Sequence, residues 1–415
     1  MHNSQYRTEE GILKGWRNLF HMLNYHMPQG VHLMNPERIP FFTGYPDATL
    51  FDWDQYFEGL IQLYLDWPTV YATNAIRIFL DRQDAAGYIG RAVPDRWPGD
   101  MVKPFLAQLA LAAFHKDGHL EWLRGEPYRR MKLYVEHWFH AKDPRGAGLS
   151  VWANAGHTGM DNQHDRAGRR KENFCEGIDL NAYLVREAEA MSLLAGTLGE
   201  TADAVHFREM SQGRAETVRR ELWHEEDGFF YDRDARDGSW LRIKHVGAFA
   251  ALWAGIATEA QAKRLVKEHL LNEKEFHRPW PVPALAANEP GYFAGFDADD
   301  HPRCCSWRAH TWIPTNYYTV HGLRRYGFHD AANHIVERTW EMFLTHPFYE
   351  YYVTENGLGT GIRPFRGWSS LAMFMPIEAK WALDPTRLSS ENDATARMRE
   401  IVKELMYGKE TLKRG

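Results

Sequence analysis

The chain has 415 residues, of which 44% are hydrophobic and 25% charged, so it can bury the core of one large domain or of two or three average ones. Its formal net charge of −6 excludes the strong basic excess that marks most nucleic-acid-binding proteins. No run approaches the roughly 18 apolar residues of a membrane helix, and the first residues form no charged-then-apolar leader. We therefore expect neither a nucleic-acid partner nor a membrane partner.

Helical patterns dominate the chain from its beginning to its end. Apolar residues recur at steps of three and four over 180–198 and over 312–326, where Tyr326-Gly327 is typical of a helix end. Similar stretches cover 9–26, 55–66, 69–83, 102–116, 118–140, 202–221, 246–255, 258–270, 329–345, 367–383 and 393–407. About a dozen helices in succession predict an all-α fold of helix pairs, an (α/α)6 barrel.

Strand patterns are few, and the clearest predicts a minor β-hairpin over 228–243 that turns at Asp237-Gly238. No linker or shift of composition divides the chain, so we predict a single catalytic domain over 1–415, with a polar helical extension from about 386 to 415. Three long irregular stretches remain, at 142–178, 271–308 and 346–366. Long loops on a rigid scaffold commonly carry functional sites.

The three cysteines are Cys175, Cys304 and Cys305, and none forms a CxxC pair. An odd number with two adjacent members argues against a disulfide framework, so we expect a reduced, cytoplasmic protein. His157, His164 and Asp165 share one loop, but their spacing fits no common zinc signature. We expect no metal.

Aromatic residues are abundant, with 16 Trp, 19 Tyr and 22 Phe. They indicate either a large aromatic core or a carbohydrate pocket, because the C–H faces of sugars pack on aromatic rings. Composition alone leaves both interpretations open.

Two loops place carboxylates in notable surroundings. Asp161 lies between Gly159 and Asn162, which favour a tight turn that holds the carboxylate forward, although an Asp that bonds its own turn would look the same. Glu350 lies among aromatic residues, where an ionised carboxylate is costly unless it is paired or used in chemistry. Glu355 precedes an Asn-Gly pair, and we assign it to a solvated turn.

Arg308 stands between Trp307 and Trp312. It either pairs with a carboxylate and holds a loop, or binds the hydroxyls or acidic group of a sugar. Asp54 follows Trp53, downstream of Tyr45. It either accepts hydrogen bonds from two sugar hydroxyls or caps the helix that begins beside it.

In combination, these segments resemble glycoside hydrolase family 63, within the larger group that also holds trehalase. The matching motifs follow one another in order across most of the chain. They are Trp53-Asp54, Gly159-Met-Asp161-Asn, Asp179-Leu-Asn-Ala, Leu222-Trp223 with Gly228 and Tyr231-Asp232, Trp307-Arg308 with Trp312, and Glu350-Tyr-Tyr with Gly361 and Gly367-Trp368-Ser369. One departure is that the Trp-Arg-Gly-Pro of the family reads Trp307-Arg308-Ala309-His310, which alters the floor of the sugar pocket.

The resemblance implies an inverting, exo-acting hydrolase of a small α-glucoside or α-mannoside, such as glucosylglycerate, mannosylglycerate or an α-disaccharide. Asp161 would be the general acid and Glu350 the general base, with the two carboxyls about 6.5–9.5 Å apart to admit a water. The substrate-binding residues would be Tyr45, Trp53, Asp54, Trp307, Arg308, Trp312 and Trp368. No cofactor is implied, and self-association into a homo-oligomer is compatible with the sequence. Lys244, Arg308, Arg363 and Arg366 are available for a glycerate carboxylate.

Three alternatives remain. A trehalase-like disaccharide hydrolase would use the same two acids. A sugar epimerase or isomerase on the same barrel would use histidines, for which His245, His310 and His321 are candidates. A carbohydrate-binding protein without activity would not need both carboxylates.

Overall fold

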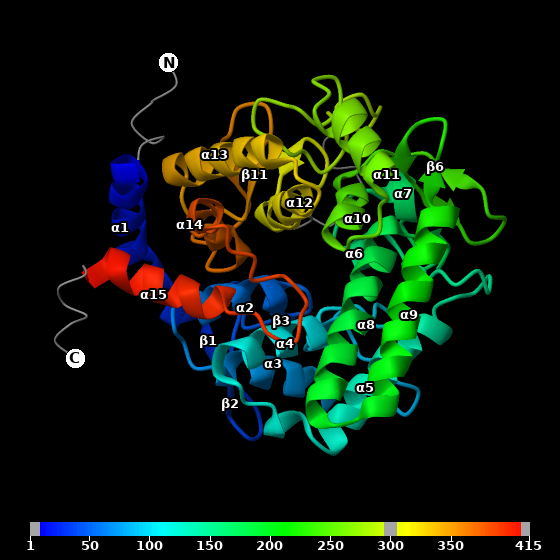
Figure 1. The fold of residues 1–415 in the computed structure, drawn as a ribbon, viewed down its shortest axis with the longest axis horizontal. Coiled ribbons are helices and arrows are strands. Elements are labelled where there is room, and N and C mark those ends of the chain that lie inside the picture. Colours follow the sequence, from blue (N-terminus) through cyan, green and yellow to red (C-terminus); the bar gives the residue numbers. More distant parts are fainter. Residues whose placement is uncertain (1–8, 294–304, 408–415) are drawn as a thin grey trace.

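The computed structural model describes residues 9–293 and 305–407, and its inner helical segments form a closed ring (Figure 1). In chain order they are α2 (Asp54–Tyr64), α4 (Leu106–Asp117), α8 (Ile178–Leu198), the 3-10 turn η4 (Val246–Phe249) with α10 (Ala250–Trp253), α12 (Ile313–Arg325), and the 3-10 turn η6 (Trp368–Met373) with α14 (Met375–Trp381). Each segment contacts the next, and η6 contacts α2, so the ring closes on itself.

A second layer of helices surrounds this ring (Figure 1). It comprises α1 (Glu9–His26), α3 (Val70–Leu80), α5 (Glu126–His140), α9 (Thr201–Glu221), α11 (Glu259–Arg264) with the π turn η5 (Leu265–Leu270), and α13 (His329–Thr345). Because the outer helices cover the ring, every residue of α2 is buried, whereas α9 buries only one face. The predicted (α/α)6 barrel is confirmed.

The predicted helix boundaries agree best where the apolar period is regular. The predictions 9–26 and 329–345 coincide with α1 and α13. The prediction 118–140 was too long, because the chain first makes the 3-10 turn η3 (Glu121–Leu123) and α5 begins only at Glu126. The prediction 246–255 contains a 3-10 turn and a single α-helical turn instead of one helix. The short elements η2 (Met27–Gly30), α6 (Ala155–Thr158) and α7 (His164–Ala167) were not predicted.

The strands are short and all their pairings are antiparallel. They are β1 (Val31–Met34) with β2 (Ile39–Phe42), β3 (Leu50–Phe51) with β4 (Ala92–Val93), β5 (Cys175–Glu176) with β8 (Asp232–Asp234) and β9 (Trp240–Leu241), β6 (Trp223–His224) with β7 (Phe229–Phe230), and β10 (His310–Thr311) with β11 (Tyr351–Val353) and β12 (Gly359–Thr360). The predicted hairpin exists as β8 and β9, in register Asp232 to Leu241, with Gly238 at φ +75° in its turn. Its expected first part instead pairs with β6.

At the end of the chain, α15 (Ala394–Tyr407) packs across the outside of α2 and α4 and touches α1 (Figure 1). The division of the chain into one domain and an extension from about 386 remains a prediction. Within the described ranges, we find no helix with the length and apolarity needed to span a bilayer.

Candidate active site

The predicted site residues gather at one end of the ring, where several inner helices begin. Asp54 is the first residue of α2, Trp312 precedes α12, and Trp368 is the first residue of η6. The three long loops meet at the same end, because β10 of one loop region pairs with β11 of another, and Cys305 bonds the loop of Asp161. The fold therefore brings together residues that are far apart in the sequence.

The turn before Asp161 is tight for a specific reason. Gly159 has φ +84°, and a Cβ there would lie 2.9 Å from the indole ring of Trp53. The N–H of Met160 donates to Thr158 Oγ1 at 2.9 Å, and the N–H of Gln163 donates to the carbonyl of Met160 at 3.0 Å. The Asp161 carboxylate accepts the main-chain N–H of Cys305, from a different loop, so its bond is to the site and not to its own turn.

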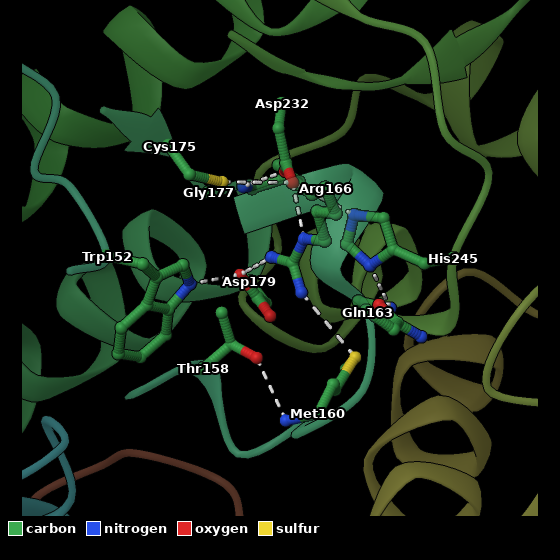
Figure 2. A network of polar contacts seen from close by, with 12 residues as sticks. Trp152, Thr158, Met160, Gln163, Arg166, Cys175, Gly177, Asp179, Asp232 and His245 are labelled. Atoms are coloured by element: carbon green, nitrogen blue, oxygen red, sulfur yellow. Dashed lines mark hydrogen bonds and ion pairs between the residues drawn. The ribbon is translucent and has the colours of Figure 1, made fainter. Parts of the chain in front are cut away.

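A fully buried arginine supports this turn from behind. Figure 2 shows Arg166 between two carboxylates, Asp179 and Asp232, with its Nε 2.5 Å from Asp232 Oδ2. Arg166 Nη1 also reaches the sulfur of Met160 at 3.5 Å, directly before Asp161. Asp232 accepts the N–H of Ile178 at 2.7 Å. The Asp-Leu-Asn-Ala and Tyr-Asp motifs therefore supply the two anions that hold Arg166.

Asn162 joins the loop of Asp161 to the tryptophan-rich segment. The N–H of Trp307 donates to Asn162 Oδ1 at 2.8 Å, and Arg308 donates to the Asn162 carbonyl through Nε at 3.2 Å and Nη2 at 3.0 Å. Of the interpretations given for Arg308, the structure supports that of a residue that holds a loop, since its guanidinium donates to the main-chain carbonyl of Asn162. Its contact with a sugar stays a prediction.

Glu350 is only 2% exposed, and several donors converge on its carboxylate. The N–H of Ile362 donates to Oε2 at 3.0 Å, the thiol of Cys305 donates to Oε1 at 3.3 Å, and the Tyr45 hydroxyl also bonds it. Gly361, at φ +78°, permits this approach, because a Cβ there would lie 2.6 Å from Oε2. Burial raises the pKa of Glu350 above its ordinary 4.5, and these donors oppose that rise.

The main chain of Glu350 is also fixed. Its carbonyl accepts Trp368 Nε1 and Ser369 Oγ, each at 3.1 Å. This explains why the Gly-Trp-Ser motif accompanies the glutamate in the sequence. Glu355 differs from our prediction of a solvated turn: it pairs with Arg278 at 2.9 Å and is partly buried, because the loop folds back on that arginine.

The predicted aromatic residues form one contiguous cluster beside the two carboxylates. Trp307 and Trp312 stack with centroids 3.7 Å apart and planes at 5°. Trp53 lies 5.7 Å from Trp307 and 6.3 Å from Trp368, and Tyr45 lies 6.3 Å from Trp368. All five predicted aromatic site residues are therefore brought together.

Asp54 lies in this cluster with an unusual environment. It is 3% exposed, and its Oδ1 has no hydrogen-bond partner among the described residues. Burial and the nearby Asp52 raise the pKa of Asp54 to about 8, although Lys103 lowers it. The interpretation of Asp54 as a helix cap is wrong, because Asp54 is itself the first helical residue and Trp53 occupies the capping position.

Two charged groups near the acids were not among the predicted site residues. Lys103 is fully buried and pairs with Asp52 at 3.0 Å. Arg91 stacks over Trp97 at 5.2 Å, and its Nε is buried without a hydrogen-bond partner in the described structure. Burial raises the pKa of Asp161 to about 6, and Arg91 and Lys103 hold it from rising further. Arg91 lies in none of the sequence motifs. Its proximity to Asp161 becomes visible only in the structure.

Cys305, also absent from the predicted site, limits the separation of Asp161 and Glu350. Its N–H bonds one carboxylate and its thiol bonds the other. A cysteine nitrogen and sulfur are at most about 4 Å apart, so the two bonded oxygens lie within roughly 10 Å of each other. This bound includes the spacing of inverting glycosidases, about 6.5–9.5 Å.

Comparisons with known proteins agree with this architecture. Residues 50–369 match the family model described as the mannosylglycerate hydrolase MGH1-like glycoside hydrolase domain. Since this is more than half of the chain, the protein belongs to that family, and the resemblance to glycoside hydrolase family 63 is confirmed.

The individual relatives share about a quarter of their aligned residues with this chain. The mannosylglycerate hydrolase of Rubrobacter radiotolerans is 25% identical over 203 residues, 49% of this chain and 44% of that protein. The chain thus matches less than half the length of this relative. The mannosylglycerate hydrolase of Thermus thermophilus is 24% identical over 383 residues, 78% of this chain and 87% of that protein.

Two solved structures share the fold. A GH63 mannosylglycerate hydrolase from Thermus thermophilus, in complex with Tris and D-glycerate, has a TM-score of 0.66 at 20% identity and covers 88% of this chain and 100% of that chain. The neutral trehalase from Saccharomyces cerevisiae has a TM-score of 0.61 at 18% identity, covering 89% of this chain and 81% of that chain.

Proposed function

We propose that the protein is an inverting, exo-acting hydrolase of a small α-mannoside or α-glucoside. The observation that carries this proposal is the placement of Asp161 and Glu350 on either side of one residue, Cys305, beside an aromatic cluster. Membership of a glycoside hydrolase family supports the reaction class.

The two carboxyls suit different roles. Asp161 has a pKa raised to about 6 by burial, so it is largely protonated in mildly acidic solution and can donate to the leaving oxygen. Glu350 accepts bonds from Ile362, Cys305 and Tyr45, which favour its ionised form, and an ionised carboxylate can take a proton from water. The C–O bond breaks while that water adds to the opposite face of the sugar, which inverts the anomeric carbon.

The sugar would lie against the aromatic cluster, with Asp54 as a hydroxyl acceptor. The unpartnered Asp54 Oδ1 supports this, because a buried polar atom normally has a partner. Mannosylglycerate is the first substrate to test, because two relatives are named as hydrolases of that compound. Of the cations considered for its carboxylate, Lys244 is already 2.5 Å from Glu275, whereas Arg363 lies over Tyr349, next to Glu350.

The alternatives have less support. A trehalase-like enzyme would use the same two acids. Comparing the rates of hydrolysis of trehalose and of the glycerate conjugates distinguishes it from the proposed function. For an epimerase, the buried imidazoles of His245 and His321 each lie beside a carboxylate, Asp232 at 3.3 Å and Glu378 at 3.1 Å. His310 lies beside the site, with its ring 5.2 Å from that of Tyr351, and burial lowers its pKa to about 4.

A panel of α-glycosides tests the proposal. We expect released mannose or glucose from mannosylglycerate or glucosylglycerate, at rates above those for trehalose and methyl α-glycosides. Proton NMR of the fresh product should show the β anomer first. An α anomer as first product would exclude inversion, and an isomer of unchanged mass would indicate an epimerase.

A further inference from the structure

One residue, Cys305, contacts both carboxyls that the proposed hydrolysis requires. Its main-chain N–H bonds Asp161, and its thiol sulfur lies 3.3 Å from Glu350 Oε1. These two acids come from loops that are separated by almost half of the chain. Cys305 therefore connects two groups whose relative position the reaction depends on.

The segment that carries Cys305 is anchored on two sides. Trp307 and Arg308 are bonded to Asn162, next to Asp161, at 2.8 Å and 3.0 Å. The carbonyl of Ser306 accepts Trp312 Nε1 at 2.9 Å, inside the aromatic cluster. A displacement of this segment would therefore change both the acid loop and the sugar-lining rings.

We propose that Cys305 is a positioning residue for this hydrolysis, with its N–H fixing the Asp161 carboxylate and its thiol fixing the Glu350 carboxylate. The role of Cys305 in catalysis rests on the proposed function. The contact between its thiol and Glu350 can be tested without any measurement of turnover.

The thiol contact has a chemical consequence for the base. A thiol is a weak donor, but a bond to an ionised carboxylate is stronger than one to a neutral acceptor. The groups that face Glu350 are Asp161, Tyr45, Tyr351 and Cys305. Among them, Cys305 and Tyr45 donate to the carboxylate and lower its pKa, whereas the charge of Asp161 raises it. Removal of the thiol should therefore make Glu350 harder to ionise.

The first experiment measures the contact through the reactivity of the thiol. The parent protein carries Cys304→Ser, which removes the adjacent thiol so that alkylation in this segment reports on Cys305 alone. Cys304 itself lies outside the described residues. The rate of alkylation of Cys305 by iodoacetamide is followed by mass spectrometry at fixed pH, with Cys175, fully buried, as the internal reference.

In this assay Glu350→Gln should speed alkylation several-fold, because the anion that keeps the thiol protonated is gone. Glu355→Gln is the matched control, since that glutamate lies in the same loop but pairs with Arg278, and it should leave the rate unchanged. Equal rates in Glu350→Gln and the parent, both with native circular dichroism, would overturn the proposed contact.

The second experiment separates a positioning role from a merely structural one. Cys305→Ala removes the donor, whereas Cys305→Ser keeps a hydroxyl donor. In the pH profile of kcat/KM, the acidic limb of Cys305→Ala should move to higher pH by about half a unit to one unit, and that of Cys305→Ser should stay close to the parent. Unmoved limbs in both variants would remove the positioning role. If the parent cleaves no α-glycoside, the proposed function fails, and the alkylation assay still decides the contact.

Discussion

The two ends of the inner ring differ in how many hydrogen-bond partners their buried carboxyl groups have. At the site end, Asp54 begins α2 with Oδ1 unpartnered among the described residues and a pKa raised to about 8 by burial. At the far end of α2, Tyr64 donates to Glu378 at 3.0 Å, and from α12 Tyr317 donates at 2.8 Å and His321 lies 3.1 Å away. At the site end Asp54 Oδ1 has no partner among the described residues, whereas at the far end the Glu378 carboxylate is held by several donors.

The strongest test of this contrast removes the chemistry and keeps the fold. Asp161→Asn and Glu350→Gln should each lower kcat by about a thousandfold or more, because neither amide can exchange the required proton. Thermal unfolding should show that both variants stay folded. Glu355→Gln is the control, because it makes the same change of side chain in the same loop as Glu350→Gln, and its kcat should stay close to that of the parent. A near-parental kcat on the best substrate in either variant would refute its catalytic assignment.

The far end should respond in stability and not in rate. Glu378→Gln removes the charge that three donors share, and we expect a loss of about 3–5 kcal/mol in the free energy of unfolding. Asp54→Asn is the matched change at the site end, and it should cost less than about 1 kcal/mol, since no described donor to Oδ1 is lost. Chemical denaturation measures both, and equal losses would mean that the two ends do not differ.

The far end also predicts a dependence of stability on pH. Burial lowers the pKa of His321, but Asp384 and Glu378 outweigh it and raise the pKa from 6.5 to about 9. A raised pKa gives stability that is complete below pH 6.5 and is lost as pH rises through 9, on the order of 3 kcal/mol. Unfolding measured from pH 6 to 10 checks this, and His321→Gln should flatten the dependence. A parental slope in His321→Gln would assign the effect to other groups.

The smallest expected effect concerns Arg91 at the site end. Since Arg91 lowers the pKa of Asp161, Arg91→Gln should move the alkaline limb of kcat/KM from near pH 6 to higher pH, by up to about one unit. Arg96→Gln is the control, because Arg96 forms an exposed pair with Asp47 at 2.9 Å. Identical limbs in both variants would show that Arg91 does not tune the acid.

Much of the fold follows from local pattern, because helices such as α1 and α13 repeat their apolar residues at a regular spacing. The break between η4 and α10 was not predictable, since the segment is buried on every side and carries no alternation to locate a boundary. Similarly, the pairings of β5 with β8 and of β10 with β11 join segments that are far apart in the sequence, which local pattern does not reveal.

Some residues of the candidate site could be predicted from sequence motifs, and others could be found only from the structure. Asp161, Glu350 and the aromatic residues lie in motifs, so the sequence sufficed to nominate them, and their roles stay predictions that the variants above test. Cys305 and Arg91 act across long distances in the chain, and nothing in their sequence neighbours indicates their partners. Glu355 misled for the converse reason: an Asn-Gly turn suggests solvent, whereas Arg278 comes from a segment far away.

Trp368 links two properties that an engineer would wish to vary separately. Its ring faces Trp53 and Trp312, and its Nε1 anchors the carbonyl of Glu350. A smaller side chain at this position would enlarge the space beside these rings but remove a donor to the Glu350 carbonyl, so under the proposed function a broader substrate range would come with slower turnover. Redesign for larger glycosides should therefore leave this indole in place.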